Sequence, residues 1–302
     1  MRVFVAGGTG VIGRRLVPQL VARGHEVTAT TTRPARLGLL EQLGARGVVM
    51  DGLDPAAVGE AVAAARPDAV VIQMTALAPE HVGKMSPRKP EYFATTNRLR
   101  AEGTDHLLAA AEASGGCCVV AQSAAIFNCT PKGGQIKTED DPLEVIGGEA
   151  VYHLEEAVAR ADGAVLRYGA LYGPDAIEGW MALVRKRMFP IVGGGTGWMS
   201  LVHVDDAAAA TVLAVEQKAA GVFNIVVDEP APVREWVPYL AQGAGAKPPR
   251  RIPTWVVRPL AGEMMVAMMT RGHGFSNAKA KRELGWQPRY SSWRVGFKAE
   301  FA

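Results

Sequence analysis

A glycine-rich loop near the start of the chain is the first segment whose residue types could do chemistry. Its residues are Gly7-Gly8-Thr9-Gly10-Val11-Ile12-Gly13. Gly7 allows a tight turn, Gly10 lets the backbone approach a pyrophosphate, and Gly13 lets a helix pack close to a strand. The first N–H groups of that helix, at its positive end, then face the phosphates. This loop predicts a dinucleotide site; the alternative is an ordinary glycine turn. The predicted cofactor-binding residues of the loop are Gly7, Thr9, Gly10, Val11, Ile12 and Gly13.

The segment after the second predicted strand indicates which dinucleotide binds. An NAD site usually has an acidic residue there to bond the adenosine ribose, but no acid occurs between Glu26 and Glu41. Thr32 and Arg33 end this strand instead, and Arg36 follows one turn later. A guanidinium suits a ribose 2′-phosphate by its charge and by its fork of donors. We therefore expect NADP(H) in preference to NAD(H); the alternative is that both arginines are solvated surface charges.

Four further residues complete the predicted cofactor site. Asp51 follows the third predicted strand and is a candidate for the adenine amino group, although an Asp at this position also commonly caps a turn. Gly52, Thr75 and Tyr168 are assigned to the same site.

These residues need a sheet to position them, and the chain alternates apolar runs with Ala/Leu-rich helical stretches. The predicted strands are 2–6, 27–31, 48–50, 69–72, 118–122, 164–168 and 222–227. The predicted helices are 16–23, 37–43, 56–65, 104–113, 151–160 and 207–215. Repeated strand–helix units predict an α/β fold, a doubly wound parallel sheet covered on both faces.

Two regions interrupt this alternation and predict a second lobe. Residues 174–200 hold a helical stretch and a glycine loop, and residues 229–302 are rich in Pro and Trp. We predict a dinucleotide-binding domain of residues 1–173 and 201–228, with a smaller substrate-binding lobe of residues 174–200 and 229–302. The lobe would lie beside the carboxyl edge of the sheet.

Composition excludes several classes of protein. The 302 residues are 48% hydrophobic and 21% charged, with a net charge of +3 spread along the chain, so neither disorder nor nucleic-acid binding is expected. No apolar run reaches the roughly 18 residues that a membrane helix needs, and glycines follow the first strand where a signal peptide would continue. Three cysteines are too few for a disulfide framework. We expect a cytoplasmic protein that binds neither a membrane nor nucleic acid.

Four other segments, together with the glycine loop, carry a resemblance that spans nearly the whole chain. They are Gln122-Ser123-Ala124-Ala125-Ile126-Phe127, Leu166-Arg167-Tyr168-Gly169-Ala170-Leu171-Tyr172-Gly173-Pro174, Leu201-Val202-His203-Val204-Asp205-Asp206 and Lys281-Arg282-Glu283-Leu284-Gly285-Trp286-Gln287-Pro288. In this order they resemble the extended short-chain dehydrogenase/reductases, the superfamily of NAD(P)-dependent epimerases, dehydratases and carbonyl reductases. The resemblance implies a homodimer as one assembly, through a helix pair near the catalytic Tyr.

The resemblance also implies a catalytic Ser and Tyr. By position these are Ser123, which would polarise a substrate carbonyl, and Tyr152, which would exchange its proton. The family's Lys, four residues after the Tyr, is replaced by Glu156. Because a phenol with a pKa of about 10 needs a nearby cation to act as a base, a carboxylate here would leave Tyr152 a proton donor only.

Three interpretations of Tyr152 are open. Ser123 and Tyr152 could act together, with the cofactor's charge or a distant cation in place of the Lys. Proton transfer could instead have moved to His153 or Tyr172, with Ser123 retained. Finally, Tyr152 could be an aromatic residue that packs on the sheet, in a fold that binds dinucleotide without turnover.

His203, Asp205 and Asp206 could suggest a metal site, because imidazole and carboxylates bind divalent ions. We predict no metal here. An Asp just before the alanine run 207–210 is a natural N-cap, with its side chain on the free N–H groups of the helix.

Together these patterns predict an NADPH-dependent oxidoreductase that reduces a carbonyl of a small metabolite by hydride transfer. One alternative is an epimerase or dehydratase of a nucleotide-linked sugar that retains its cofactor. Another is a non-catalytic sensor of NADP(H).

Overall fold

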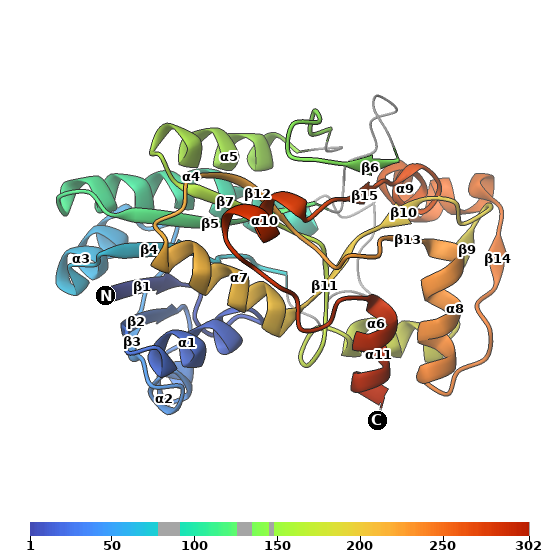
Figure 1. The fold of residues 1–302 in the computed structure, drawn as a ribbon, viewed down its shortest axis with the longest axis horizontal. Coiled ribbons are helices and arrows are strands. Elements are labelled where there is room, and N and C mark those ends of the chain that lie inside the picture. Colours follow the sequence, from blue (N-terminus) through green and yellow to red (C-terminus); the bar gives the residue numbers. More distant parts are fainter. Residues whose placement is uncertain (78–90, 126–134, 145–147, 302) are drawn as a thin grey trace.

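A computed structural model of the chain describes residues 1–77, 91–125, 135–144 and 148–301. A seven-stranded parallel sheet runs through the left half of Figure 1, in the order β12-β7-β5-β4-β1-β2-β3. Its strands are β1 (Arg2–Ala6), β2 (Glu26–Thr31), β3 (Arg46–Val49), β4 (Ala69–Ile72), β5 (Cys118–Ala124), β7 (Ala164–Tyr168) and β12 (Gly221–Ile225). All seven predicted strands are present, with bounds that differ by a few residues.

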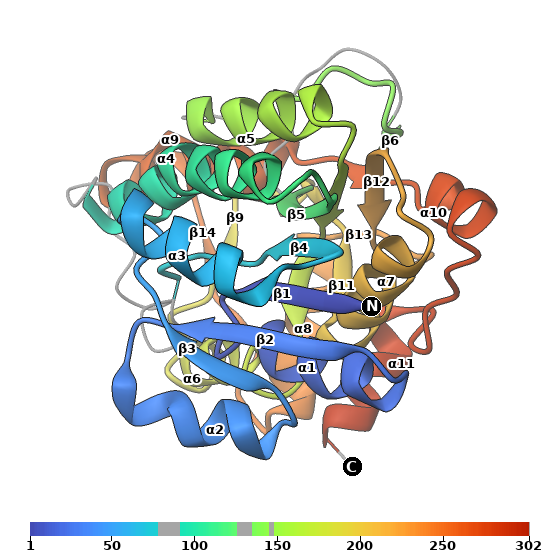
Figure 2. The ribbon, with the colours of Figure 1, turned by 90° about the vertical axis from the view of Figure 1, so that its left-hand side faces the viewer.

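Helices cover both faces of this sheet, which confirms the doubly wound fold (Figure 2). One face carries α3 (Pro55–Ala65), α4 (Glu91–Ala113) and α5 (Glu149–Arg160), and the other carries α1 (Gly13–Ala22), α2 (Leu37–Gln42) and α7 (Val204–Glu216). Because both faces are covered, a strand such as β4 is buried at every position. Among the described residues, no helix has the length and apolar character needed to cross a bilayer.

A second group of elements lies beside the carboxyl ends of the strands, at the right of Figure 1. Its helices are α6 (Glu178–Arg185), α8 (Val233–Gly243), α9 (Thr254–Arg271) and α11 (Trp293–Phe301). Short strands join them: β9 (Ile191–Val192), β10 (Trp198–Met199), β13 (Ala231–Pro232) and β14 (Arg251–Ile252). They share a core in which Tyr172, Trp236, Trp293 and Phe297 are fully buried. The division of the chain into two domains stays a prediction.

The remaining elements connect these two parts. They are the 3-10 turn η1 (Pro34–Arg36), β6 (Ile136–Lys137), β8 (Ala170–Tyr172), β11 (Leu201–His203), β15 (Gly274–Phe275) and α10 (Ala278–Glu283). β8 pairs with β11, and β6 pairs with β15.

Helix α4 begins at Glu91, well before the predicted start at residue 104. Neighbouring threonines and Gly103 lower the intrinsic helix propensity of the added turns. Packing compensates, because Thr96 is fully buried and its Oγ1 accepts a hydrogen bond of 3.1 Å from the Ala76 N–H. Arg100, one turn later, is also buried.

The predicted Asp N-cap of α7 is wrong. The cap is His203, whose Nδ1 accepts from the Asp205 N–H at 3.1 Å. Asp206 lies inside the first turn, and its carboxylate accepts from the backbone N–H groups of Arg289 and Tyr290 at 2.8 and 3.0 Å. The helix therefore starts three residues earlier than predicted, and Asp206 fixes the segment after α10 instead.

Candidate cofactor and active site

The glycine loop turns tightly between β1 and α1. The Gly7 N–H donates to Thr30 Oγ1 and the Gly8 N–H donates to the Thr30 carbonyl, both at 3.0 Å. Gly7 has a φ of +100°, and a Cβ there would lie 2.8 Å from the carbonyl oxygen of Gln73. Both the conformation and the neighbouring strand end therefore require glycine at position 7.

Gly13 and Gly10 differ in what surrounds them. A Cβ on Gly13 would lie 2.4 Å from the Gly7 carbonyl oxygen and 2.6 Å from that of Gly8, so the loop folds directly over the helix start. A Cβ on Gly10 would meet only the Gly7 carbonyl oxygen, at 3.2 Å, and Gly10 faces a cavity. The Arg14 and Arg15 N–H groups donate to the Gly10 and Ile12 carbonyls at 3.0 and 2.9 Å, so the donors that this edge of the cavity offers to an anion are the N–H groups just before them, from Val11 to Gly13.

Two arginines stand at the end of β2 beside the same cavity. Thr31 is buried, and its Oγ1 accepts from the Arg33 N–H at 3.2 Å and from the Thr9 hydroxyl at 3.3 Å. Thr32, Arg33 and Arg36 are exposed, and all three line the cavity. Within the described part of the chain, neither arginine forms an ion pair with an acidic residue. Both guanidinium groups are thus available to an anionic ligand.

Asp51 caps a turn and lines the cavity, and its contact with the adenine amino group stays a prediction. Its Oδ1 accepts from the Leu53 N–H at 2.9 Å, which caps a turn, while the residue also lines the cavity. Gly52 lines it too, and a Cβ there would lie 2.4 Å from the Met74 sulfur. Thr75 lines the cavity from the segment after β4.

Tyr168 lies behind the cavity, away from its lining. It is 2% exposed, and its hydroxyl accepts from Gln73 Nε2 at 3.0 Å and contacts Thr211 Oγ1 at 2.5 Å. Burial raises the pKa of this phenol to about 12. Gln73 does line the cavity, so Tyr168 positions a lining residue and does not itself face a ligand.

The cavity measures about 1230 Å³ and joins all these segments. Every predicted cofactor residue except Gly13 and Tyr168 lines it. Among the lining residues that the sequence did not indicate, one group comes from β5 and from the segment around α6. These are Gln122, Leu171, Asp175, Glu178, Gly179, Ala182, Leu183, Lys186 and Met188. Others, among them Gln73, Met74, Thr95 and Leu99, come from the segment after β4 and from α4. Helix α6 thus lines the same cavity as the glycine loop, and no spacing rule in the sequence connects the two.

Ser123 is engaged by a buried ion pair. Its hydroxyl donates to Glu155 Oε1 at 2.5 Å, and Arg167 donates to both oxygens of the same carboxylate at 2.6–3.2 Å. The exposed fractions of the Glu155 and Arg167 side chains are 11% and 8%. Ser123 and Arg167 are register partners on β5 and β7, so helix α5 places Glu155 over the two strands. This cluster was not predicted from the sequence, in which only the opposite charges of Glu155 and Arg167 could have indicated it.

The structure places the Glu156 side chain on the solvent side of α5. Tyr152 is half-buried, and it is not among the described residues that line the cavity. The Glu156 side chain is 73% exposed and lies 3.8 Å from Arg160. The carboxylate that faces the predicted serine is therefore Glu155, one position earlier. The segments 126–134 and 145–147, which flank Ser123 and α5 in sequence, lie outside the described residues.

Comparison with known proteins gives similarity along the whole chain. The profile of the NAD dependent epimerase/dehydratase family matches residues 3–226. A 3-diazoavenalumate denitrifying reductase from a Streptomyces species is 44% identical over 314 residues, covering 99% of this chain and 100% of that protein. A 2-alkyl-3-oxoalkanoate reductase from Stenotrophomonas maltophilia is 27% identical and covers 96% of both chains.

Solved structures show the same fold. A UDP-glucose 4-epimerase from Thermotoga maritima, with UDP-glucose, superposes with a TM-score of 0.77 at 24% identity and covers 100% of this chain and 97% of its own. A human epimerase family protein with NADPH has a TM-score of 0.76 at 22% identity and covers 100% and 99%. At these identities the likeness concerns the fold alone.

Proposed function

This chain belongs to the NAD dependent epimerase/dehydratase family, and from that membership we propose that it is a reductase that takes its hydride from NADPH. It is an NAD(P)-dependent oxidoreductase of the extended short-chain type, and its two curated relatives described above are named reductases. The preference for NADPH, the roles of individual residues and the acceptor are the proposed parts.

The pair of arginines at the end of β2 carries the proposal. Arg33 and Arg36 line the cavity beside the glycine loop, where a bound dinucleotide would have its adenosine ribose. A 2′-phosphate placed there would meet two guanidinium groups and no carboxylate between Glu26 and Glu41. When bound, NADPH supplies the hydride, and this chain's residues hold its phosphates, its ribose and its adenine.

Replacing Arg33 and Arg36 together by alanine is expected to weaken NADPH binding by about a hundredfold and NADH binding by less than about threefold. Each Arg–phosphate hydrogen bond is worth roughly 1.5–3 kcal/mol, and partial exposure to solvent reduces the sum. Titrations followed by nicotinamide fluorescence measure both constants.

The matched control is Arg46→Ala, which removes an exposed guanidinium from β3 outside the cavity. It should leave both affinities unchanged. Equal losses for NADH and NADPH in the double variant would rule out the 2′-phosphate contact, and a wild-type protein that binds neither nucleotide would overturn the proposed function.

The first candidate acceptor is a carbonyl of a small metabolite. Its reduction consumes a proton at oxygen as well as a hydride, so Ser123 would turn its hydroxyl from Glu155 to the substrate and Tyr152 would supply the proton. The relative from Stenotrophomonas supports this candidate, because its name describes an oxo acid.

The second candidate is a diazo group, and one observation favours it. The Ser123 hydroxyl donates its hydrogen bond to Glu155, and no tyrosine occurs among the described residues that line the cavity. Exchange of an arenediazonium group for hydride breaks the C–N bond, forms a C–H bond and releases N2, and it needs no proton from the protein. The name of the Streptomyces relative describes such a loss of nitrogen from a diazo compound.

Ser123→Ala separates the two candidates. With NADPH and an arenediazonium salt, we expect enzyme-dependent release of N2 at the same rate in the wild-type and variant proteins. With a panel of ketones and aldehydes, any carbonyl reduction should fall in the variant by about 10²-fold, the usual cost of one oxyanion donor. Reduction of carbonyls alone, lost in the variant, would exclude the diazo candidate. Turnover without enzyme is measured in parallel and subtracted.

We further propose a reducing, cytoplasmic location and a small-molecule substrate. Cys117 and Cys118 are free thiols, and burial raises the pKa of Cys118 to about 11, which keeps it protonated and unreactive. A homodimer through a helix pair near Tyr152 remains part of the proposal, as does the absence of nucleic-acid and membrane partners.

A further inference from the structure

The residue that follows Gly13 places a third guanidinium at the cofactor cavity. Arg14 is the second residue of α1 and lines the cavity together with Gly10, Val11 and Ile12. Its neighbour Arg15, on the same helical turn, is not among the described lining residues. Arg14 is therefore the cation nearest in sequence to the N–H groups that the helix start offers to phosphates.

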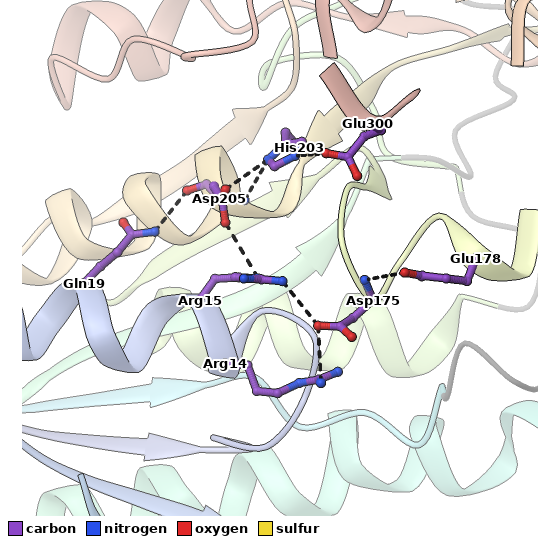
Figure 3. Close-up of polar contacts among 8 residues, drawn as sticks. All are labelled: Arg14, Arg15, Gln19, Asp175, Glu178, His203, Asp205 and Glu300. Carbon is purple, nitrogen blue, oxygen red and sulfur yellow. Dashed lines mark hydrogen bonds and ion pairs between the residues drawn. The ribbon is translucent and has the colours of Figure 1, made fainter. Parts of the chain in front are cut away.

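Both arginines are held by one carboxylate from the other side of the cavity (Figure 3). Asp175 Oδ2 lies 3.2 Å from Arg14 Nη1 and 3.3 Å from Arg15 Nη2. Arg15 has a second acidic neighbour, Asp205, at 3.8 Å, whereas Arg14 has Asp175 alone among the described residues. The Asp175 backbone has a φ of +70° and its N–H donates to Glu178 Oε1 at 3.0 Å, which anchors the backbone of this loop to the start of α6.

The Arg14 guanidinium retains unused donors. A guanidinium carries five N–H donors, and the contact of Arg14 with Asp175, an ion pair at 3.2 Å, occupies at most one of them. Its Nε is buried and has no partner within the described part of the chain. At 32% side-chain exposure the group is neither free in solvent nor enclosed, so a second anion can reach it from the cavity.

We propose that Arg14 binds the diphosphate of the dinucleotide and that Asp175, on the loop before α6, orients it for that contact. The inference rests on the proposed function, because it assigns a residue to the same site. Arg33 and Arg36 would then hold the 2′-phosphate at one end of the cavity, and Arg14 the diphosphate at the glycine loop. Since Asp175 also leads into α6, its carboxylate joins the start of α1 to the α6 wall of the cavity.

Two fragments of the cofactor test this division. ADP-ribose carries the diphosphate without the 2′-phosphate, and adenosine 2′-monophosphate carries the 2′-phosphate without the diphosphate. Arg14→Ala should weaken ADP-ribose and NADPH by about tenfold to a hundredfold, the range for a charge-assisted hydrogen bond, and should change adenosine 2′-monophosphate by less than about threefold. The Arg33/Arg36 double variant should show the reverse pattern for the two fragments. Calorimetry or competition against NADPH fluorescence measures each constant.

Arg15→Ala is the matched control, because it removes a contact to the same Asp175 oxygen without removing a lining residue. It should leave all three ligands within about threefold of wild type. Asp175→Asn gives a second measurement that does not touch either arginine: loss of its orienting charge should weaken ADP-ribose by severalfold and spare adenosine 2′-monophosphate.

Several outcomes would overturn the inference while the proposed function stands. Wild-type protein that binds NADPH, with Arg14→Ala unaffected toward ADP-ribose, excludes the diphosphate contact. If Arg14→Ala weakens ADP-ribose and adenosine 2′-monophosphate equally, the substitution affects the site as a whole. If Arg15→Ala weakens ADP-ribose as much as Arg14→Ala does, the ion pairs with Asp175 matter only for packing. If the wild-type protein binds no nucleotide, the proposed function fails first and this inference fails with it.

Discussion

Replacing Arg167 by methionine is expected to lower the free energy of unfolding by about 3–5 kcal/mol, the range for removing one partner from a buried ion pair. Glu155 would keep its charge in a site that is nearly closed to solvent, and among the described residues only the Ser123 hydroxyl would be left to bond it. Methionine conserves much of the volume, so the loss would report the uncompensated carboxylate more than a cavity. Urea denaturation, followed by tryptophan fluorescence, measures it.

The double variant Glu155→Leu/Arg167→Met is the control. Because it removes both charges together, it should recover most of the lost stability and lie within about 2 kcal/mol of wild type. A single variant that loses less than about 1 kcal/mol would mean that Glu155 finds another partner or becomes protonated, and our account of the pair would be wrong.

Gly13→Ala is expected to weaken binding of NADPH and NADH alike by at least about a hundredfold, because a displacement of about 1 Å at a binding loop can have an effect of that size. The new Cβ would lie within 2.6 Å of the carbonyl oxygens of Gly7 and Gly8, which are backbone atoms and cannot rotate away. The loop or the helix must therefore shift. Overpacking of this kind also costs roughly 1–3 kcal/mol of stability. The nucleotide titrations and urea denaturation measure both effects.

Gly59→Ala provides the comparison. Gly59 lies inside α3, and a Cβ there would meet no atom within 4 Å. The substitution should raise the unfolding free energy by about 0.5–1 kcal/mol through helix propensity and leave nucleotide binding unchanged. If the Gly13→Ala and Gly59→Ala variants bound NADPH equally tightly, nucleotide affinity would not depend on the close packing of the loop against the helix.

The sheet and the glycine loop could be predicted because their signals are local. A run such as 69–72 is apolar at every position, and only a strand covered on both faces buries all of it. The loop at residues 7–13 has its strand before it and its helix after it, so the context that the motif needs is contiguous in sequence. The start of α4 was missed because it depends on tertiary contacts, such as the bond from Ala76 to Thr96.

Which glutamate of α5 faces Ser123 could not be predicted from the sequence. Glu155 and Glu156 are identical neighbours, about 100° apart on a helix, and nothing local says which one faces the sheet. That choice depends on Arg167, twelve residues later, and on Ser123, thirty-two residues earlier. The charge at position 156, which the sequence places where the family has its Lys, faces solvent in the structure.

The wall formed by α6 could not be predicted for a related reason. The α6 wall comes about a hundred residues after the end of β4, and its lining residues Gly179, Ala182 and Lys186 are of types that occur in any amphipathic helix. Only the three-dimensional arrangement brings them to the cavity. The same holds for the pairing of Arg14 with Asp175, which are 161 positions apart.

The strand order has a consequence for how the protein is made. From β1 the sheet extends on one side through β2 and β3 and on the other through β4, β5, β7 and β12, so no strand is inserted between two earlier ones. A chain that leaves the ribosome from its N-terminus can therefore add each strand to an edge that already exists. The nucleotide-facing segments up to residue 77 emerge about a hundred residues before α6, so the glycine loop is made well before the α6 residues that complete its cavity.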